Sequence, residues 1–343
     1  MIFTNDKVKQ LQHWIADAKH ILVTAHKSPD GDSIGSSLGL FHYLKKKNPN
    51  VWICHPDVAP NFLHWMPGFD NILNLDNHNS EVKKHFEEAD LIFCLDYNSS
   101  ARIGQMEPLM NASTAKKVMF DHHRDPDEKF CDLMFSDISS CSTSQLVFEF
   151  IEASNDLNLL DEIIGTPLYT GIVTDTGSFR FSSTQPKTHH IVASLIEHGV
   201  KHWEAHENTF DDNSLDRIKL VSYALLEKLE VKPEFKTAFI AINEAEQKRF
   251  NAKKGDTEGL VNQALGIEGV RMAAFFKEDD GIIKISFRSK GSIPVNDLAR
   301  NYFQGGGHLN ASGGKFVGKM DDAIQKFVTI LPKFVQENKA LFE

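Results

Sequence analysis

Short apolar runs recur through the first 120 residues, and a loop and a helical stretch separate each run from the next. The runs are ILVTA (21–25), VWIC (51–54), LIFCL (91–95) and KVMF (117–120). Buried strands that alternate with helices are typical of a parallel sheet covered by helices on both faces. We therefore expect an α/β fold in this part of the chain, with the carboxyl ends of the strands gathered along one edge of the sheet.

The pattern changes in the C-terminal third of the chain. The runs KTAFIAIN, VRMAAFFKE and GIIKISFRS predict strands of a smaller sheet, and Asp279-Asp280-Gly281 between the last two is a hairpin signal. A glycine-rich loop (304–314) and a closing helix (about 320–337) follow. We expect a parallel-sheet domain, a helical connector and a smaller α/β domain, with a cleft between the two domains. Their predicted ranges are 1–195, 196–234 and 235–343.

Composition narrows the class of protein. The net charge is −10, from 37 basic and 47 acidic residues, whereas proteins that coat long nucleic acids are usually basic. A polyanionic ligand must therefore be small, or be held by metal ions and a local positive cluster. No apolar run approaches the ~18–20 residues of a membrane-spanning helix, and the first residues offer no apolar signal-peptide core. The four cysteines show no Cys-x-x-Cys spacing, which favours a reducing cytoplasm over a zinc ribbon or a disulfide framework.

Aspartate and histidine side chains directly follow four of the apolar runs. ILVTA is followed by His26, Asp30 and Asp32, and LIFCL by Asp96. The other two runs, KVMF and LYTGIVT (168–174), are followed by Asp121-His122-His123 and by Asp175. Because the strand ends of a parallel sheet share one edge, the first three groups can meet in space. Asp175 would join them from the end of a helix or strand packed beside that edge.

Four carboxylates in one cleft need compensation. Asp30, Asp32, Asp96 and Asp175 cannot all stay ionised at short range unless positive charge is supplied. Two divalent cations would neutralise them, and carboxylate oxygens mixed with imidazole suit Mn²⁺ or Mg²⁺, with Co²⁺, Fe²⁺ and Zn²⁺ as alternatives by affinity. One aspartate that bridges two ions ~3.5–4 Å apart is the arrangement used to activate water for phosphoryl hydrolysis.

Each motif taken alone has a simpler interpretation. Loops after strands carry Asp and Gly for turn geometry, and a single Asp such as Asp96 or Asp175 is often a helix cap. The equivalent position of all four groups favours a metal site over these interpretations. A further set, His198, His202 and His206, has a spacing that could bind a metal on a continuous helix, but Gly199 interrupts that helix.

The combined motifs resemble those of the DHH phosphoesterases, over nearly the whole chain. The matching segments are TAHKSPDGDSIGSSLGL, LDYNSSARIG, GIVTDTGSFRFSST and, in the tail, GGGHLNASGG (305–314). The resemblance implies that His26, Asp30 and Asp96 hold one metal ion. It implies that Asp96 bridges to a second ion, whose other ligands are Asp32, His122 and Asp175. It further implies that Asp121 orients a histidine, and that His123 faces the substrate phosphate, as a donor to a non-bridging oxygen or to the leaving group.

The tail carries candidate substrate-binding residues. Gly305, Gly306 and Gly307 can expose backbone N–H groups to an anion, His308 adds a donor, and Arg288 could fork onto a phosphate. A hairpin turn and a surface charge are the simpler alternatives. The resemblance to a DHH-associated C-terminal domain favours a grip on the far phosphate or the terminal nucleotide. In the first domain, Arg102 either reaches the site or pairs with a carboxylate.

The resemblance extends to the activity. It points to short two-domain members that hydrolyse nanoRNAs of a few nucleotides and remove phosphate from 3′-phosphoadenosine 5′-phosphate, with Mn²⁺ first among the cations and Mg²⁺ or Co²⁺ as alternatives. Two other functions stay open, a soluble cyclic-dinucleotide or linear dinucleotide phosphodiesterase and a catalytically silent nucleotide-binding protein. The intact motifs argue against the silent protein. The sequence leaves the oligomeric state open, and a homodimer is compatible with it.

Overall fold

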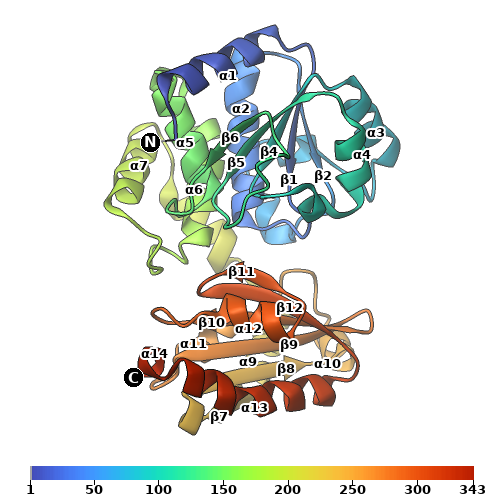
Figure 1. Cartoon of the computed structure of the whole chain (residues 1–343), viewed down its shortest axis with the longest axis vertical. Helices are drawn as coiled ribbons and strands as arrows, with labels where there is room; N and C mark the ends of the chain where they lie inside the picture. The colour runs from blue at the N-terminus through green and yellow to red at the C-terminus, as the bar shows by residue number, and fades with distance from the viewer. Residues whose placement is uncertain (1) are drawn as a thin grey trace. The chain divides into compact units, whose positions relative to one another are not determined.

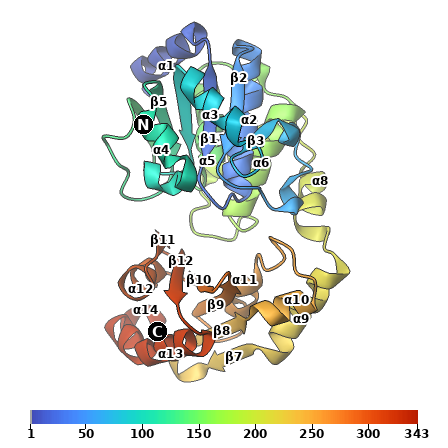
Figure 2. The ribbon, with the colours of Figure 1, turned by 90° about the vertical axis from the view of Figure 1, so that its right-hand side faces the viewer.

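The structure is a computed structural model that describes residues 2–343 and forms two compact units, one ending at Asp212 and the other beginning at Asn213. Each unit contains a six-stranded sheet (Figures 1 and 2). The segment in which we expected a helical connector contributes to both units, because its first helices belong to the first unit and the rest to the second. Within residues 2–343, no helix is both long and apolar enough to cross a membrane.

The sheet of the first unit is entirely parallel, in the order β3-β2-β1-β4-β5-β6. Its strands are β1 (Ile21–Ala25), β2 (Val51–His55), β3 (Ile72–Asn74), β4 (Leu91–Leu95), β5 (Lys116–Asp121) and β6 (Leu133–Ser136). This confirms the predicted α/β fold and adds β3 and β6, the two edge strands. Both are too short to stand out as apolar runs, and β3 is only half-buried.

Helices cover both faces of this sheet (Figures 1 and 2). They are α1 (Asn5–Asp17), α2 (Gly31–Lys47), α3 (Asn79–Glu88), α4 (Glu107–Ala112), α5 (Thr143–Ala153), α6 (Glu162–Asp175), α7 (Pro186–Glu197) and α8 (His202–His206). Alternate residues of one strand enter different cores, since Ile21 and Val23 pack with α1, α2, α5 and α6, whereas Leu22 packs with α3 and α4. Burial on both sides explains why β1 and β4 are continuously apolar.

A row of glycines lets α2 and α6 approach closely. Gly31, Gly35 and Gly39 are four residues apart and so lie on one face of α2. A Cβ added at Gly31 or Gly39 would overlap side chains of α6, and one added at Gly35 would overlap the backbone of that helix. The close packing places Asp32, in the first turn of α2, beside the last turn of α6.

The second unit has a mixed sheet in the order β11-β12-β10-β9-β8-β7, in which only the β8–β9 pair is parallel. Its strands are β7 (Leu229–Lys232), β8 (Thr237–Ile242), β9 (Met272–Asp279), β10 (Ile282–Ser289), β11 (Gly306–His308) and β12 (Ala311–Val317). Its helices are α9 (Leu215–Glu227), α10 (Glu244–Arg249), α11 (Leu260–Leu265), α12 (Val295–Tyr302), α13 (Met320–Glu337) and α14 (Lys339–Phe342). The β9–β10 hairpin forms at the predicted turn.

The glycine-rich tail segment that we expected as a loop is instead a β-hairpin, β11 and β12. The glycines serve close backbone contact: a Cβ at Gly305 would overlap the Gly313 carbonyl oxygen, and Gly307 has a φ of 136°. The glycine run therefore predicted a turn, but most of it lies on paired strands, where Gly307 allows a close approach between backbones.

Candidate metal centre

The first group of candidate ligands lies at the carboxyl ends of β1 and β4, which are neighbours in the sheet. His26 follows β1, and its Nε2 lies 3.6 Å from Asp30 Oδ2 and 3.3 Å from Asp96 Oδ2. The His26 Nδ1–H donates to the Lys27 carbonyl over 2.8 Å, which leaves Nε2 to face the carboxylates. Asp30 also caps α2, but with its other oxygen, Oδ1. The cap and ligand interpretations of Asp30 are therefore compatible.

The second group gathers around His122, directly after β5. Its Nε2 lies 3.4 Å from Asp96 Oδ1, 3.5 Å from Asp175 Oδ2 and 3.9 Å from Asp32 Oδ2. The opposite nitrogen, Nδ1, donates to the Ser140 carbonyl over 3.3 Å. Asp175 is the last residue of α6 and keeps about a third of its side chain exposed, 32%. Asp32 and Asp96 are buried.

Asp96 belongs to both groups, with one oxygen in each. Oδ2 faces His26 and Oδ1 faces His122. The residue has a φ of 62°, a left-handed conformation that turns the chain sharply as β4 ends. A carboxylate with each oxygen directed to a different cluster of ligands has the geometry that a bridge between two cations requires. The two His–carboxylate clusters therefore fit a pair of divalent ions, because each offers imidazole nitrogen and carboxylate oxygen without thiolate.

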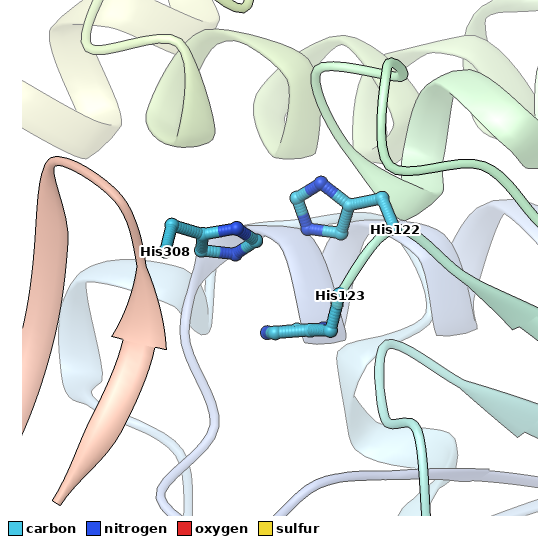
Figure 3. Close-up of side chains that lie close together, drawn as sticks. All are labelled: His122, His123 and His308. Atoms are coloured by element: carbon cyan, nitrogen blue, oxygen red, sulfur yellow. The ribbon is translucent and has the colours of Figure 1, made fainter. Parts of the chain in front are cut away.

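Asp121 and His123 form a pair beside these groups. The His123 Nδ1–H donates to Asp121 Oδ1 over 2.7 Å, and its backbone N–H donates to Asp121 Oδ2 over 3.1 Å. Asp121 is fully buried, whereas His123 is half-buried. The rings of His122 and His123 project from successive positions after β5 (Figure 3). Asp121 thus fixes the ring orientation of His123, and the Nε2 of His123 faces away from Asp121.

Crowding perturbs the protonation of the side chains. Burial raises the pKa of Asp32 well above its ordinary value, and Asp96 and Asp175 add to this effect. Burial, with Asp96 and Asp30, raises the pKa of Asp175 to about 6. For His26 and His122, burial alone would lower the pKa, but the facing carboxylates outweigh it, so both pKa values stand well above the ordinary one. Without cations to balance the charge, the crowded carboxylates therefore favour the protonated forms of these groups.

These shifts predict that the binding of divalent cations releases protons, with Mn²⁺ as the test ion. A metal needs neutral imidazole and ionised carboxylate, and the raised pKa values of His26, His122 and Asp32 favour protonated forms that must give up protons when a cation binds. The apparent affinity should therefore rise with pH until those pKa values are passed. Titration calorimetry at neutral pH, in buffers of different ionisation enthalpy, should show net release of about one proton or more. Affinity that does not change between about pH 6 and pH 8 would contradict this electrostatic account.

The predicted substrate-binding residues of the second unit lie around its edge hairpin. Arg288 on β10 is opposite Ala311 of β12, which in turn is opposite His308 of β11. Directly opposed residues point to the same face of a sheet, so Arg288 and His308 share a face. Gly306 and Gly307 lie on β11, the edge strand, and Gly305 directly precedes it. His308 projects from the end of that strand (Figure 3).

The remaining candidates have different surroundings. The Arg102 carbonyl accepts the Lys27 N–H over 2.8 Å, so the backbone of Arg102 lies beside the loop after β1. The histidine series does not come together, because His198 bonds to the Ser194 carbonyl and His206 to the Tyr169 hydroxyl. Among residues 2–343, no cluster of metal-ligating groups contains this series.

Sequence reasoning missed the start of α5. There Thr143 and Ser144 donate to two of the candidate ligands, Asp32 and Asp96. The run SSCSTS (139–144) marks the start of a helix, but neutral side chains of this kind give no signal of contact with a metal ligand.

Most of this chain is similar to known proteins. The model of the DHH family, N-terminal domain, matches residues 20–172, and that of the DHHA1 domain matches residues 235–337. The bifunctional oligoribonuclease and PAP phosphatase NrnA of Bacillus subtilis is 30% identical over 85% of this chain and 88% of that protein. The protein of the same description from Thermus thermophilus is 28% identical over 89% and 87%. A solved structure of an exopolyphosphatase-related protein from Bacteroides fragilis is 38% identical, with a TM-score of 0.93 over 98% of both chains.

Proposed function

Because this chain belongs to the DHH family, with a DHH domain followed by a DHHA1 domain, we propose that it is a metal-dependent phosphoesterase. Its proposed substrates are short oligoribonucleotides and 3′-phosphoadenosine 5′-phosphate. The observation that carries this proposal is the pair of His–carboxylate clusters that share Asp96, in a chain similar along most of its length to two oligoribonuclease and PAP phosphatase enzymes. The free cysteines support a reducing cytoplasm as the compartment.

The residues of the first unit would take distinct parts in the reaction. His26, Asp30 and Asp96 would hold one cation, and Asp96 would share the other with Asp32, His122 and Asp175. When bound, the two cations, Mn²⁺ first and Mg²⁺ or Co²⁺ as alternatives, would neutralise charge on the phosphate and activate water. His123, oriented by Asp121, would donate a hydrogen bond to a phosphate oxygen or to the leaving group.

The second unit would provide the grip on the rest of the substrate. Arg288 and His308 share one face of the sheet beside the edge strand of glycines, which supports a site for a second phosphate or a terminal nucleotide. An oligonucleotide and a nucleoside bisphosphate both carry such a phosphate in addition to the one that is attacked. Arg102, in the first unit, remains a candidate for the same role.

A substrate panel tests the function. RNA dinucleotides, RNA 5-mers, 3′-phosphoadenosine 5′-phosphate, pyrophosphate and cyclic dinucleotides are incubated with the full chain and Mn²⁺, and again with EDTA. We expect mononucleotides and phosphate from the first three substrates with Mn²⁺ and none with EDTA. Preferential hydrolysis of cyclic dinucleotides would instead support the phosphodiesterase alternative. Binding of the panel without any turnover would support the silent protein.

Replacing Arg288 by alanine should separate binding from chemistry. The Arg288→Ala variant should raise KM for a 5-mer about tenfold or more, since it removes a charge-assisted contact, and should change turnover of bis-p-nitrophenyl phosphate little. His308→Ala should act in the same direction. The matched control is Lys284→Ala, on the same strand and face, whose ammonium pairs with Asp279. Equal losses on both substrates would contradict a role for Arg288 in gripping the substrate.

A further inference from the structure

The start of α5 contacts both clusters of candidate ligands through uncharged groups. The Thr143 backbone N–H donates to Asp32 Oδ2 over 2.6 Å, and the Ser144 N–H donates to Asp32 Oδ1 over 2.9 Å. The Thr143 hydroxyl donates to Asp96 Oδ1 over 3.0 Å. These contacts are buried and join segments more than 40 residues apart in the sequence. One residue, Thr143, thus donates to two different carboxylates of the metal centre.

These hydrogen bonds leave room for metal ligation. A carboxylate oxygen has about two acceptor positions, and each oxygen of Asp32 gives one of them to an α5 amide. Asp96 Oδ1 likewise gives one to Thr143 and faces His122 with the other side. The contacts therefore fix how the two carboxylates are rotated without occupying them fully. The first-turn amides also favour negative charge on Asp32.

The start of α5 is itself held in place by neighbouring helices, so it can fix the positions of the two carboxylates. The Gln145 side chain accepts from the Thr188 hydroxyl of α7 over 2.8 Å and donates to Glu149 over 3.0 Å. On the other side, α6 is packed so closely that a Cβ at Gly171 would overlap Ser144 Oγ and lie 2.8 Å from Asp32 Oδ1. A shift of the ligands relative to α5 therefore has little space to occur.

We propose that Thr143 is a positioning residue of the metal centre. Its hydroxyl sets the rotation of Asp96, and its amide sets the distance between Asp96 and Asp32. The cluster around His122 depends on this contact, because it uses the Asp96 oxygen that Thr143 holds, whereas the cluster around His26 uses the other oxygen. Loss of the hydroxyl therefore weakens the binding of one cation, the one held by the cluster around His122, more than the binding of the other. The inference rests on the proposed function, since it requires that the centre bind two ions.

The test compares Thr143→Val, which replaces the hydroxyl by a methyl group of similar size, with Thr143→Ser, which keeps the hydroxyl. The full chain is first stripped of metal with a chelator, and the chelator is then removed. Mn²⁺ alone is titrated into this protein and its binding is measured by calorimetry. We expect two ions in the wild type, about tenfold or more weaker binding of one ion in Thr143→Val, and affinities close to wild type in Thr143→Ser. Excess Mn²⁺ should restore the hydrolysis rate of Thr143→Val. The control is Thr170→Val, which removes a buried hydroxyl that donates to the Thr166 carbonyl within α6.

The outcomes separate the inference from the function. Two ions in the wild type with unchanged affinities in Thr143→Val would overturn the positioning role alone. Fewer than two ions in the wild type would overturn the two-ion function and the inference with it. Melting curves in chelator show whether each variant is folded. If Thr143→Val does not fold, the same titration uses Thr143→Ala, for which unchanged binding of both ions likewise overturns the proposal.

Discussion

Replacing Asp96 by asparagine should lower the rate of phosphoester hydrolysis by on the order of a thousandfold and leave the fold intact. Asp96 offers one oxygen to the cluster around His26 and the other to the cluster around His122. The loss of its charge should therefore weaken cation binding by both clusters. Asparagine is the suitable replacement because it keeps the shape of the side chain and tolerates the left-handed backbone at this position. Alanine would add backbone strain to the loss of the ligand.

The measurement combines kcat at saturating Mn²⁺ with the number of ions bound per chain. Asp96→Asn should bind fewer than two ions, and Asp30→Asn, which changes a carboxylate that faces His26 but not His122, should lose less activity. Asp76→Asn is the control, since Asp76 is an exposed acid in the loop between β3 and α3. A near-normal rate for Asp96→Asn would exclude Asp96 as the ligand that both ions share.

The parallel sheet explains why the fold class and the convergence of three site residues could be predicted from the sequence. β1, β4 and β5 are adjacent strands, so the side chains that follow them must emerge at one edge whatever the intervening segments do. This places His26, Asp96 and His122 together before any contact is known. The strand pattern also predicted the fold class. Both faces of β1 and β4 are buried, and strands buried on both faces have nearly continuous apolar sequences.

The features that the sequence did not reveal depend on contacts between distant segments. Thr143 is an uncharged residue at a helix start, and its contact with Asp32 spans 111 positions. The glycines of β11 and β12 resembled a loop because glycine is typical of turns, whereas here they lie on paired strands, and Gly307 lets β11 approach the backbone of β12 closely. Periodicity and composition describe one segment at a time, so neither can show which partner a neutral side chain or a glycine meets.

Replacing Gly35 by alanine should destabilise the first unit, although alanine is the better helix former by about 1 kcal/mol. A Cβ at this position would overlap the Pro167 carbonyl oxygen and lie 2.9 Å from the Gly171 nitrogen. Both are backbone atoms of α6, which cannot rotate away as a side chain can, so the two helices must separate. Overpacking of this kind costs about 1–3 kcal/mol or more. We expect this cost to exceed the gain in helix propensity, so the melting temperature should fall by several degrees.

Gly39→Ala is the matched control, because it lies on the same face of α2 but its Cβ would meet chiefly the Leu168 side chain, with the Ile164 carbonyl oxygen farther away at 3.3 Å. A side chain can shift more readily than the backbone atoms that face Gly35, so the loss of stability should be smaller than for Gly35→Ala. Separation of α2 from α6 should also move Asp32 away from Asp175, so Gly35→Ala should bind Mn²⁺ more weakly by calorimetry. A variant as stable as the wild type, with unchanged Mn²⁺ affinity, would show that the glycine face of α2 does not set the spacing of the metal ligands.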